Sequence, residues 1–434
     1  MPGYHMSKKT SNTRIHLPVL THLDLQEAVK GRFASFCTAV GIQTLMSMMD
    51  QDVETLAGPK GKHDQNRTAY RHGFQETSIP MGPQRLSIKR PRVRSNSDRN
   101  ELPIASYEVF NNDETLIESA LGRMLHGIST RDYTRGIEDY SDVAHTFATS
   151  KSTVSRRFVQ ASEEVAKKLL SKRFDEEHIV ALLIDGVVLG DYTAIVTVGI
   201  NKDGRKLLIG VRIGTTENSQ VCEDLLTDLI NRGLNFAEGL LAVIDGSKAL
   251  RKALKKVFGD YVIIQRCQVH KMRNVLDYLP RYKRAWTKKK LRQAWSCETF
   301  EEARRKLNLL AEDLRIDYPD AANSLYEGLE ETITVLKLEI PGLLRKSLSS
   351  TNPIESGFSM VGKHIRNVKN WVNGSMVQRW VIAAMLEAEQ RFHRISGYRS
   401  ISVLIKEIKR LTVGSKIDAR ENERKTYGMK FGSI

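Results

Sequence analysis

Two short apolar segments of this chain end in the same tripeptide, an isoleucine followed by aspartate and glycine. They are Ile184-Asp185-Gly186 and Ile244-Asp245-Gly246. Each aspartate follows an apolar run of strand length, so each carboxylate is expected where a strand leaves a sheet, the place where ligands gather in open α/β sheets. Neighbouring strands lie ~4.8 Å apart, so two such carboxylates can share one divalent cation. Taken singly, each Asp-Gly is also a common turn pair.

A third acidic candidate is Glu355, in the segment Thr351-Asn352-Pro353-Ile354-Glu355. Asn352 as the helix N-cap, Pro353 at the first helical position and Glu355 three residues after the cap resemble a capping box. That pattern alone explains the glutamate. A glutamate in the first turn of a helix is also well placed to point into a neighbouring site, so both interpretations stay open here.

Cys267 and His270 form a C-x2-H pair soon after the second aspartate. Such a pair offers two of the four ligands of a structural zinc ion, but no second pair stands at zinc-finger spacing. A buried, hydrogen-bonded histidine is the alternative. The four cysteines lie far apart without a CxxC pair, which favours a reducing compartment over a disulfide framework.

The segments around the two aspartates predict a mixed α/β sheet. The predicted elements are strands over 179–184, 192–200 and 206–211, a helix over 219–230, a strand over 240–244, a helix over 248–257 and a strand over 261–265. Asp203-Gly204 is a hairpin signal between the second and third strands. The order of three antiparallel strands followed by alternating helices and strands suits an RNase H-like fold.

Two regions before this sheet predict DNA-binding elements. Residues 60–99 hold ten Lys or Arg against three acids in short alternating runs, which predicts a basic β-hairpin; a solvated loop is the alternative. Ser150 to Arg157 predicts a helix start with small polar and basic side chains, as in the recognition helix of a helix-turn-helix module; an exposed helix start in a bundle is the alternative. Before both, the spacing of Leu25, Val29, Phe33 and Phe36 predicts a core helix.

After His270 the pattern is helical to about Lys337. Residues 271–292 carry nine Lys or Arg and one acid, with Tyr282 and Trp286 interleaved and Trp295 just beyond. Aromatic rings among cations could stack on bases. Tryptophan at helical spacing is more often part of a core, and we expect core positions for Trp286 and Trp295.

The composition of the chain indicates which kind of molecule it binds. The chain has 434 residues with 67 Lys and Arg against 51 Asp and Glu, a formal net charge of +16, which favours nucleic acid. Its length allows about three domains, and its 41% hydrophobic content excludes a disordered chain. No apolar run approaches the ~20 residues that span a bilayer, so we expect no membrane partner.

The motifs together resemble a known family. Asp185, Asp245 and Glu355, with the segments 267–274 (Cys-Gln-Val-His-Lys-Met-Arg-Asn) and 351–355, are similar to the signatures of the Mutator-type bacterial insertion-sequence transposases, relatives of the plant Mutator transposase. The similarity extends from Arg71-His72-Gly73-Phe74 in the hairpin to about Arg394. One departure is His72, where the family commonly has Asn.

The resemblance implies an RNase H-like core with an Asp-Asp-Glu triad and a mainly helical insertion before the glutamate; 109 residues lie between Asp245 and Glu355. It implies that Asp185, Asp245 and Glu355 are catalytic and bind two Mg²⁺ or Mn²⁺ ions, with Asp185 bridging them. His270 is expected near the scissile phosphate as a donor or positioning group, with Cys267 packed behind it. Asp191 is a rival carboxylate, but alignment of the motif favours Asp185.

The implied function is that of a transposase that binds terminal inverted repeats and catalyses DNA strand cleavage and strand transfer. The residues expected to contact DNA are Arg71, Arg85, Lys89, Arg90, Arg92, Arg94, Lys151, Ser152, Ser155, Arg156, Lys271, Arg273, Lys288 and Lys289, and Cys267 and Asn352 support the motif. Expected partners are double-stranded DNA, as inverted repeats and as target, and further copies of the chain in a homodimer or higher oligomer. The expected location is the cytoplasm of a prokaryote, at the nucleoid.

The expected organisation has six regions: an N-terminal helical and β-hairpin region over 1–110, a helix-turn-helix-like region over 111–175, the first part of the catalytic core over 176–275, the helical insertion over 276–345, the second part of the core over 346–412 and a flexible tail over 413–434. Two alternatives to a transposase remain. One is an RNase H-like nuclease or resolvase, and the other is a non-enzymatic DNA-binding regulator whose acids are turn and cap residues.

Overall fold

The computed structural model describes residues 33–62, 66–135, 137, 140–141, 143–147, 149–214, 218–366 and 368–414. The chain divides into two compact units, Met1–Ser119 with Thr134–Ser150, and Ala120–Tyr133 with Lys151–Ile434. The predicted helical positions Leu25 and Val29, and the expected tail beyond residue 414, lie outside the described residues.

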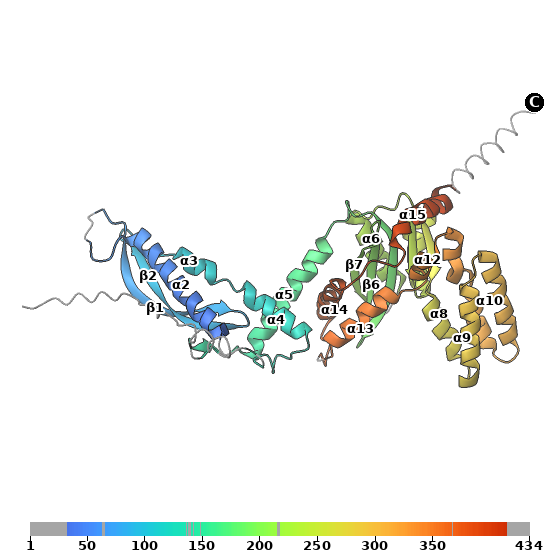
Figure 1. Ribbon diagram of the computed structural model, residues 1–434, viewed down its shortest axis with the longest axis horizontal. Coiled ribbons are helices and arrows are strands. Elements are labelled where there is room, and N and C mark those ends of the chain that lie inside the picture. Colours follow the sequence, from blue (N-terminus) through green and yellow to red (C-terminus); the bar gives the residue numbers. More distant parts are fainter. Residues whose placement is uncertain are drawn as a thin grey trace, which may run out of the picture. The chain divides into compact units, whose positions relative to one another are not determined.

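The smaller unit is built on a long β-hairpin (Figure 1). Strands β1 (Ala69–Met81) and β2 (Gln84–Ser95) pair antiparallel across a tight turn in which Gly82 has a φ of 54°. The predicted hairpin is therefore confirmed, although its strands are 13 and 12 residues long rather than short. The other elements are α2 (Phe33–Ala57), β3 (Glu101–Leu102), α3 (Ala105–Phe110), the start of α4 (Glu114–Leu125) and β4 (Thr146–Phe147).

One face of the hairpin is buried and the other carries its cations. Ile88 of β2 lies in a core that includes Leu45 and Met49 of α2, and Leu86 of the same strand is also buried. Side chains alternate along a strand, so Lys89, the residue after Ile88, points away from this core and is exposed. The same alternation that builds the hydrophobic face thus gathers basic side chains on the opposite one.

The larger unit contains a five-stranded sheet with the order β7-β6-β5-β8-β9. Its strands are β5 (Ile179–Leu189), β6 (Tyr192–Asn201), β7 (Lys206–Gly214), β8 (Leu240–Ile244) and β9 (Val262–Arg266). The first three pair antiparallel, whereas β8 pairs parallel with both β5 and β9. The predicted order of strands and helices is confirmed as a mixed α/β sheet.

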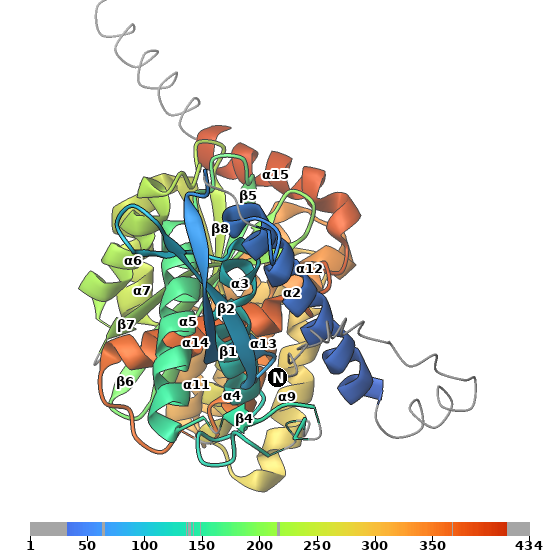
Figure 2. The ribbon, with the colours of Figure 1, turned by 90° about the vertical axis from the view of Figure 1, so that its left-hand side faces the viewer.

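Helices cover both faces of this sheet (Figures 1 and 2). Helices α6 (Ser219–Asn231) and α7 (Lys248–Phe258) share one core with Leu182 and Ile184 of β5. Helices α5 (Lys151–Ser171), α13 (Asn352–His364) and α14 (Gly374–Glu389) share the other core, which includes Leu183. Alternation along β5 therefore directs Asp185 to the face covered by α13, the helix that carries Glu355.

Helix α5 begins at Lys151, as the serine-rich start predicts, and it groups with the sheet. Its apolar face lies in the core of the larger unit, where the Phe158 ring contacts the Trp380 ring at a centroid distance of 4.3 Å. Four predicted DNA-binding residues lie exposed on its first turns: Lys151, Ser152, Ser155 and Arg156.

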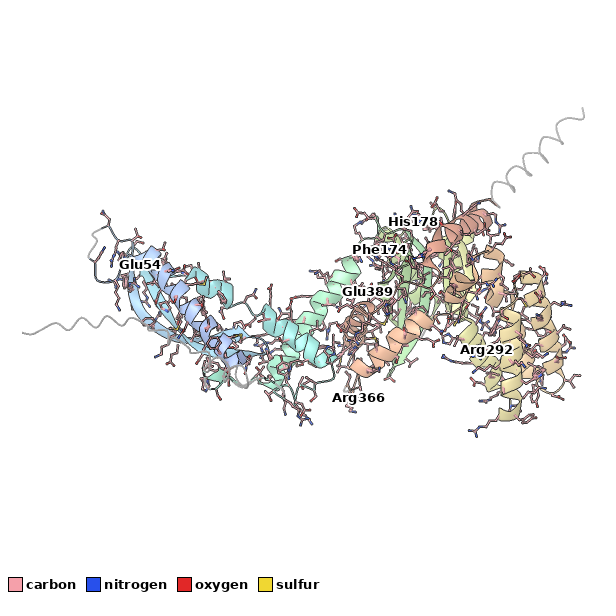
Figure 3. All side chains as sticks on the ribbon, viewed as in Figure 1. Glu54, Phe174, His178, Arg292, Arg366 and Glu389 are labelled. Atoms are coloured by element: carbon pink, nitrogen blue, oxygen red, sulfur yellow. The ribbon has the colours of Figure 1, made fainter. Side chains whose placement is uncertain are left out.

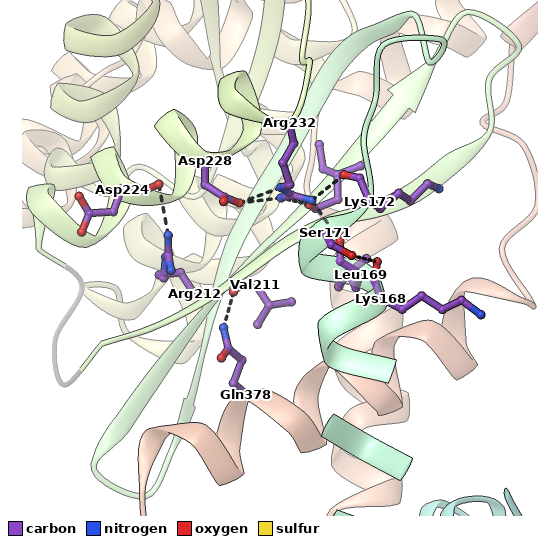
Figure 4. A network of polar contacts seen from close by, with 11 residues as sticks. Lys168, Leu169, Ser171, Lys172, Val211, Arg212, Asp224, Asp228, Arg232 and Gln378 are labelled. Carbon is purple, nitrogen blue, oxygen red and sulfur yellow. Dashed lines mark hydrogen bonds and ion pairs between the residues drawn. The ribbon is translucent and has the colours of Figure 1, made fainter. Parts of the chain in front are cut away.

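A buried arginine ties the edge of the sheet to its helices (Figure 4). Arg232, just after α6, binds the Asp228 carboxylate at 2.8 Å and donates to the backbone carbonyls of Leu169 at 3.1 Å and Ile209 at 2.7 Å. One guanidinium thus joins α6, α5 and β7. On the same strand, Leu208 N donates to the Glu389 carboxylate at the end of α14 (Figure 3).

The segment between β9 and α13 is helical, as predicted, with a hydrophobic core of its own. Its elements are α8 (Gln268–Asp277), α9 (Arg281–Trp295), α10 (Phe300–Arg315), α11 (Pro319–Tyr326), η2 (Glu330–Leu338) and α12 (Gly342–Leu348). Trp295 packs against this core, as expected. The expectation for Trp286 is wrong, because its ring lies at the surface between Lys283 and Lys290.

The remaining elements are η1 (Gly259–Tyr261), η3 (Tyr398–Ser400), α15 (Ile401–Lys409) and η4 (Arg410–Gly414). Among the helices of the described ranges, none is long and apolar enough to cross a membrane.

Candidate active site

The two aspartates come from neighbouring parallel strands at the same level of the sheet. Ile184 of β5 pairs with Ile244 of β8, and Asp185 and Asp245 are the next residues. Strand β5 continues to Leu189, so the prediction that Asp185 stands at the end of a strand is wrong. Asp185 stands instead where the ladder with β8 ends, because β8 ends at Ile244. The rival Asp191 is exposed in the turn between β5 and β6.

Asp185 is buried in a charged surrounding. Its side chain accepts a hydrogen bond from Gly186 N at 2.9 Å, and the residue is 5% exposed. Burial raises the pKa of Asp185 to about 6; the positive charge of His270 acts against this rise and the negative charge of Asp245 adds to it. Burial therefore outweighs the nearby positive charge of His270 and favours the neutral form of Asp185.

Asp245 is held by the turn that leads from β8 into α7. Its Oδ1 accepts a hydrogen bond from Ser247 N at 2.9 Å. The Ser247 hydroxyl in turn caps α7 by accepting from Leu250 N at 3.2 Å. Gly246, between them, has a φ of 109°, which residues with a Cβ rarely adopt. The turn thus fixes one oxygen of the Asp245 carboxylate.

Glu355 lies in the first turn of α13, but not in a capping box. The residue at the N-cap is Thr351 rather than Asn352, and no side chain caps this helix. Glu355 instead contacts two side chains of α8: Arg273 donates to Oε2 at 3.0 Å, and His270 Nε2 lies 3.7 Å from Oε1. Oε1 is buried and has no hydrogen-bond partner within the described part of the chain.

Cys267, His270 and Thr351 join the start of α8 to the start of α13. Thr351 Oγ1 lies 3.5 Å from Cys267 Sγ and 3.4 Å from His270 Nδ1. The backbone is tied as well, because Cys267 N donates to Ile244 O at 2.7 Å and Gln268 N donates to Ser349 O at 2.9 Å. These contacts bring segments far apart in sequence beside the end of β8.

The electrostatics of this group favour a charged histidine. A hydrogen bond with Cys267 raises the pKa of His270 to about 9 in spite of burial, and the charges of Asp185 and Glu355 add to the rise. Burial by itself would raise the pKa of the Cys267 thiol, but hydrogen bonds with His270 and Thr351 lower it. His270 therefore lies as a cation between the first aspartate and the glutamate.

Three residues have side-chain atoms that could bind one metal ion and that lie within 4.8 Å of one another. They are Cys267, His270 and Glu355. In the ranges that the structure describes, Asp185, Asp245 and Glu355 do not form such a set. The charges of both Asp185 and Glu355 act on His270, and the Glu355 carboxylate is turned toward the two cations of α8, His270 and Arg273.

Several arginines of the hairpin are held by neighbours within the smaller unit. Arg85 binds Asp113 and Asn111, and Arg90 and Arg92 both bind Glu101. The remaining predicted DNA contacts here are Arg71, which donates to Gly58 O at 2.9 Å, the exposed Lys89 and the partly buried Arg94. These cations are ordered on the sheet surface.

The predicted cations of α8 and α9 divide into three groups. Lys271 is completely buried and donates to the backbone carbonyls of Ser324 and Glu327, so the expectation that it contacts DNA is wrong. Arg273 is half exposed and binds Glu355. Lys288 is partly exposed and Lys289 is exposed on α9.

The sequence interpretation missed the roles of Thr351 and Arg273 at the glutamate. Thr351 is completely buried and contacts Cys267 and His270, although it belongs to the motif that includes Glu355. The signal available in the sequence was a residue with a hydroxyl group, Thr351, directly before the predicted start of the helix. Asn352, which the motif also includes, is exposed.

Comparisons with known proteins agree with the motifs. Residues 21–395 match the family model described as "Transposase, Mutator family". The chain is similar to the transposase for insertion sequence element ISRM5 of Rhizobium meliloti, with 27% identity over 80% of this chain and 85% of that protein. It is also similar to the transposase for insertion sequence element IS256 in transposon Tn4001 of Staphylococcus aureus, with 25% identity over 78% of this chain and 86% of the relative.

A third relative is the transposase for insertion sequence element IS6120 of Mycolicibacterium smegmatis, with 28% identity over 55% of this chain and 73% of that protein. The family match spans both the hairpin and the sheet with its helical insertion. The chain therefore belongs to the Mutator family of transposases.

Proposed function

We propose that this transposase has an RNase H-like catalytic core, binds the terminal inverted repeats of a mobile element, and catalyses metal-dependent DNA strand cleavage and strand transfer. The observation that carries the proposal is the pairing of Ile184 with Ile244, which sets Asp185 beside Asp245. The third acid, Glu355, belongs to the helix that covers the same face of the sheet, and His270 links it to Asp185.

The donor set fits hard divalent cations. Carboxylate oxygens are the ligands that Mg²⁺ and Mn²⁺ prefer, and two ions ~4 Å apart can stabilise the attacking and leaving oxygens of a phosphodiester. Two observations support the fit: burial raises the pKa of Asp185 to about 6 with a second aspartate nearby, and Glu355 Oε1 is buried without a hydrogen-bond partner. In this proposal Asp185 would bridge two ions, while Asp245 and Glu355 would each hold one.

The side chains around the acids have positioning tasks. Thr351 fixes the orientation of the His270 ring at Nδ1, so that Nε2 faces Glu355. Protonated His270 can donate a hydrogen bond to a phosphate oxygen of the strand being cut. Arg273 binds the Glu355 carboxylate, and we propose that it moves to DNA when the carboxylate takes a metal ion.

The test is cleavage of the ends of the element with Mg²⁺. The substrate is a duplex made from genomic DNA that directly flanks the coding sequence, and the variants are wild type, Glu355→Gln and the exposed Glu298→Gln as control. We expect Glu355→Gln to keep DNA binding and lose cleavage, because the amide keeps the shape of the side chain but removes its charge. Cleavage by Glu355→Gln at the wild-type rate would overturn the proposal.

The same assay separates the two alternatives. A non-enzymatic regulator would bind the flanking DNA without cutting it in any metal ion. A nuclease or resolvase would cut it without joining the product to a target duplex. Joined products that disappear in Asp185→Asn would support strand transfer at this site.

The assembly of the protein on DNA is part of the proposal. Two ends of an element must be brought together, so we propose a homodimer or higher oligomer on double-stranded DNA, at the nucleoid of a prokaryotic cell. Light scattering of the protein with and without the flanking duplex measures the stoichiometry. A complex in which a single protein chain holds two DNA ends would contradict the proposed oligomer.

A further inference from the structure

A groove beside the second aspartate is lined mainly by cations. We call it the α7 groove. Its basic side chains are Lys248, Arg251, Lys252 and Lys255 of α7 and Arg266 of β9. The lining includes two acids, Glu327 and Glu331. The groove begins at Gly246, the residue that follows Asp245, so it opens directly next to the proposed site.

The base of the groove is built around Arg266. Its side chain is 6% exposed, and it packs against Gly246 and Gly328, which both have positive φ. A Cβ at Gly246 would lie 2.2 Å from Arg266 Nε, and a Cβ at Gly328 would lie 2.7 Å from its NH1. Both glycines are therefore needed for the guanidinium to lie here.

The buried guanidinium has an unused donor. Arg266 NH1 donates to Glu327 O at 2.7 Å, and NH2 lies 3.3 Å from the Glu327 carboxylate. Nε is buried and has no hydrogen-bond partner among the described residues. An unsatisfied buried donor on a charged group is unfavourable, and an anion in the groove would reduce this cost.

A second buried cation lies beneath the same segment. The Lys271 ammonium donates to Glu327 O at 2.6 Å, the carbonyl that also accepts from Arg266. One carbonyl therefore receives two cationic donors. The Glu327 carboxylate is shared between Arg266 at 3.3 Å and Lys248 at 3.5 Å. The positive field beneath the groove is thus only partly balanced within the protein.

The rim of the groove offers exposed cations on one helix. Lys248 and Lys252 are exposed one turn apart on α7, whereas Arg251 binds Glu331. The opposite side of α7 is anchored in the core by Leu250 and Leu254. Charge changes at Lys248 and Lys252 should therefore leave the fold intact.

We infer that the α7 groove binds the sugar-phosphate backbone of the DNA that passes through the active site, on the Asp245 side. The inference rests on the proposed function and adds a DNA-binding surface to it. Phosphate is the anion that matches a row of lysines over a buried guanidinium, and it requires no base sequence. Gly246, which lines the groove, directly follows Asp245, so phosphates in the groove would lie near the phosphodiester that reacts at the proposed site.

The first test measures the salt dependence of DNA binding. The probe is a fluorescein-labelled duplex of random sequence in EDTA, titrated with full-length wild type, Lys248→Glu/Lys252→Glu and Lys248→Gln/Lys252→Gln. The control is Lys202→Glu/Lys406→Glu, which makes the same charge change as the glutamate variant at two exposed sites outside the groove, one beside His178 and one on α15. Circular dichroism and thermal melting check the folding of each protein.

Loss of two phosphate contacts should make the plot of log K against log salt less steep by ~1.8. When the salt is raised from ~50 to ~200 mM, the affinity of a groove variant should therefore fall by a factor ~10 smaller than the affinity of wild type does. Both groove variants should show this change. The control should keep the slope of the wild type. A wild-type slope in both groove variants would overturn the inference.

The second test asks which DNA occupies the groove. One arm measures cleavage of the flanking duplex, and the other measures joining of pre-cleaved 3′ ends to a target duplex. Loss of cleavage in the groove variants assigns the groove to element DNA, and loss of joining alone assigns it to target DNA. A lower salt slope with unchanged rates of both reactions would overturn the inference. If wild type neither cleaves nor joins DNA, the proposed function fails, whatever the slopes.

Discussion

Ile184 and Ile244 are direct partners in the parallel ladder between β5 and β8, so the aspartates that follow them leave neighbouring strands at one level. This register explains why Asp245 adds to the raised pKa of Asp185. Two carboxylates on adjacent strands repel each other without a cation, and burial increases the cost. Under the proposed function, divalent ions at the two aspartates would offset this repulsion.

Asp185→Asn should stabilise the metal-free protein at neutral pH. Folding raises the pKa of Asp185 from 3.8 to about 6, so the native state binds more protons than the unfolded state within this window. Stability should therefore fall as the pH rises from about 4 to about 6, by up to ~3 kcal/mol, and the loss should persist above it. Urea unfolding in EDTA across this range measures the effect in wild type and variant.

The asparagine variant should lack this fall, because its side chain does not ionise. Mg²⁺ should raise the melting temperature of wild type at neutral pH and leave that of the variant nearly unchanged. If the free energy of unfolding depends on pH in the same way in both proteins, folding does not raise the pKa of Asp185.

Arg273→Gln should strengthen binding of Mn²⁺. Arg273 donates to Glu355 Oε2 at 3.0 Å and competes with a metal ion for that carboxylate. The arginine is half exposed, and such pairs contribute ~0.2–1 kcal/mol, so the dissociation constant should fall by up to ~5-fold. Calorimetric titration with Mn²⁺ measures it, with the exposed Arg281→Gln as the control. Weaker binding in Arg273→Gln would mean that the arginine supports the metal site.

Thr351→Val should slow strand cleavage. The hydroxyl contacts His270 Nδ1 at 3.4 Å and Cys267 Sγ at 3.5 Å, and valine keeps its volume without these contacts. Loss of a residue that orients a group of the site typically costs ~10–100-fold in activity. Single-turnover cleavage across a pH series measures the loss.

Thr351→Ser restores the hydroxyl and should recover most of the rate. Equal rates for wild type and Thr351→Val at every pH would show that the threonine only fills space between α8 and α13.

Arg232→Met should destabilise the larger unit. The buried guanidinium binds Asp228 and three backbone carbonyls, and its removal leaves these acceptors without their donor (Figure 4). Breaking a buried pair costs ~3–5 kcal/mol, and urea unfolding should show a loss of this size. Arg212→Met on β7 is the control, since the Arg212 guanidinium makes a long contact of 3.5 Å to Asp224 O. If Arg232→Met loses less free energy of unfolding than the control, the contacts of Arg232 do not stabilise the larger unit.

Local patterns predicted the elements around the aspartates well. The apolar run before Asp185, the alternating residues of β6 and the short run before Asp245 specify strands, because side chains of a strand alternate between faces. Those strands are present in the predicted order. The helical insertion followed in the same way from its periodicity.

Predictions from short sequence patterns were wrong where a side chain contacts a segment far away in the sequence. The sequence around Glu355 satisfies a capping box, yet its carboxylate binds Arg273, because α8 lies beside the first turn of α13. Lys271 stands in a basic helical run, yet it is buried, since Ser324 and Glu327 supply the carbonyls that satisfy its ammonium. Trp286 has helical spacing but lies at the surface.

The sequence by itself determined which residue types could do chemistry and that two aspartates follow short apolar strands. The tertiary structure decided that these strands are neighbours in parallel register, that His270 links Glu355 to Asp185, and which cations are buried. The physical reason is that strand periodicity acts between adjacent residues, whereas the position of Glu355 depends on how 109 intervening residues fold back against the sheet.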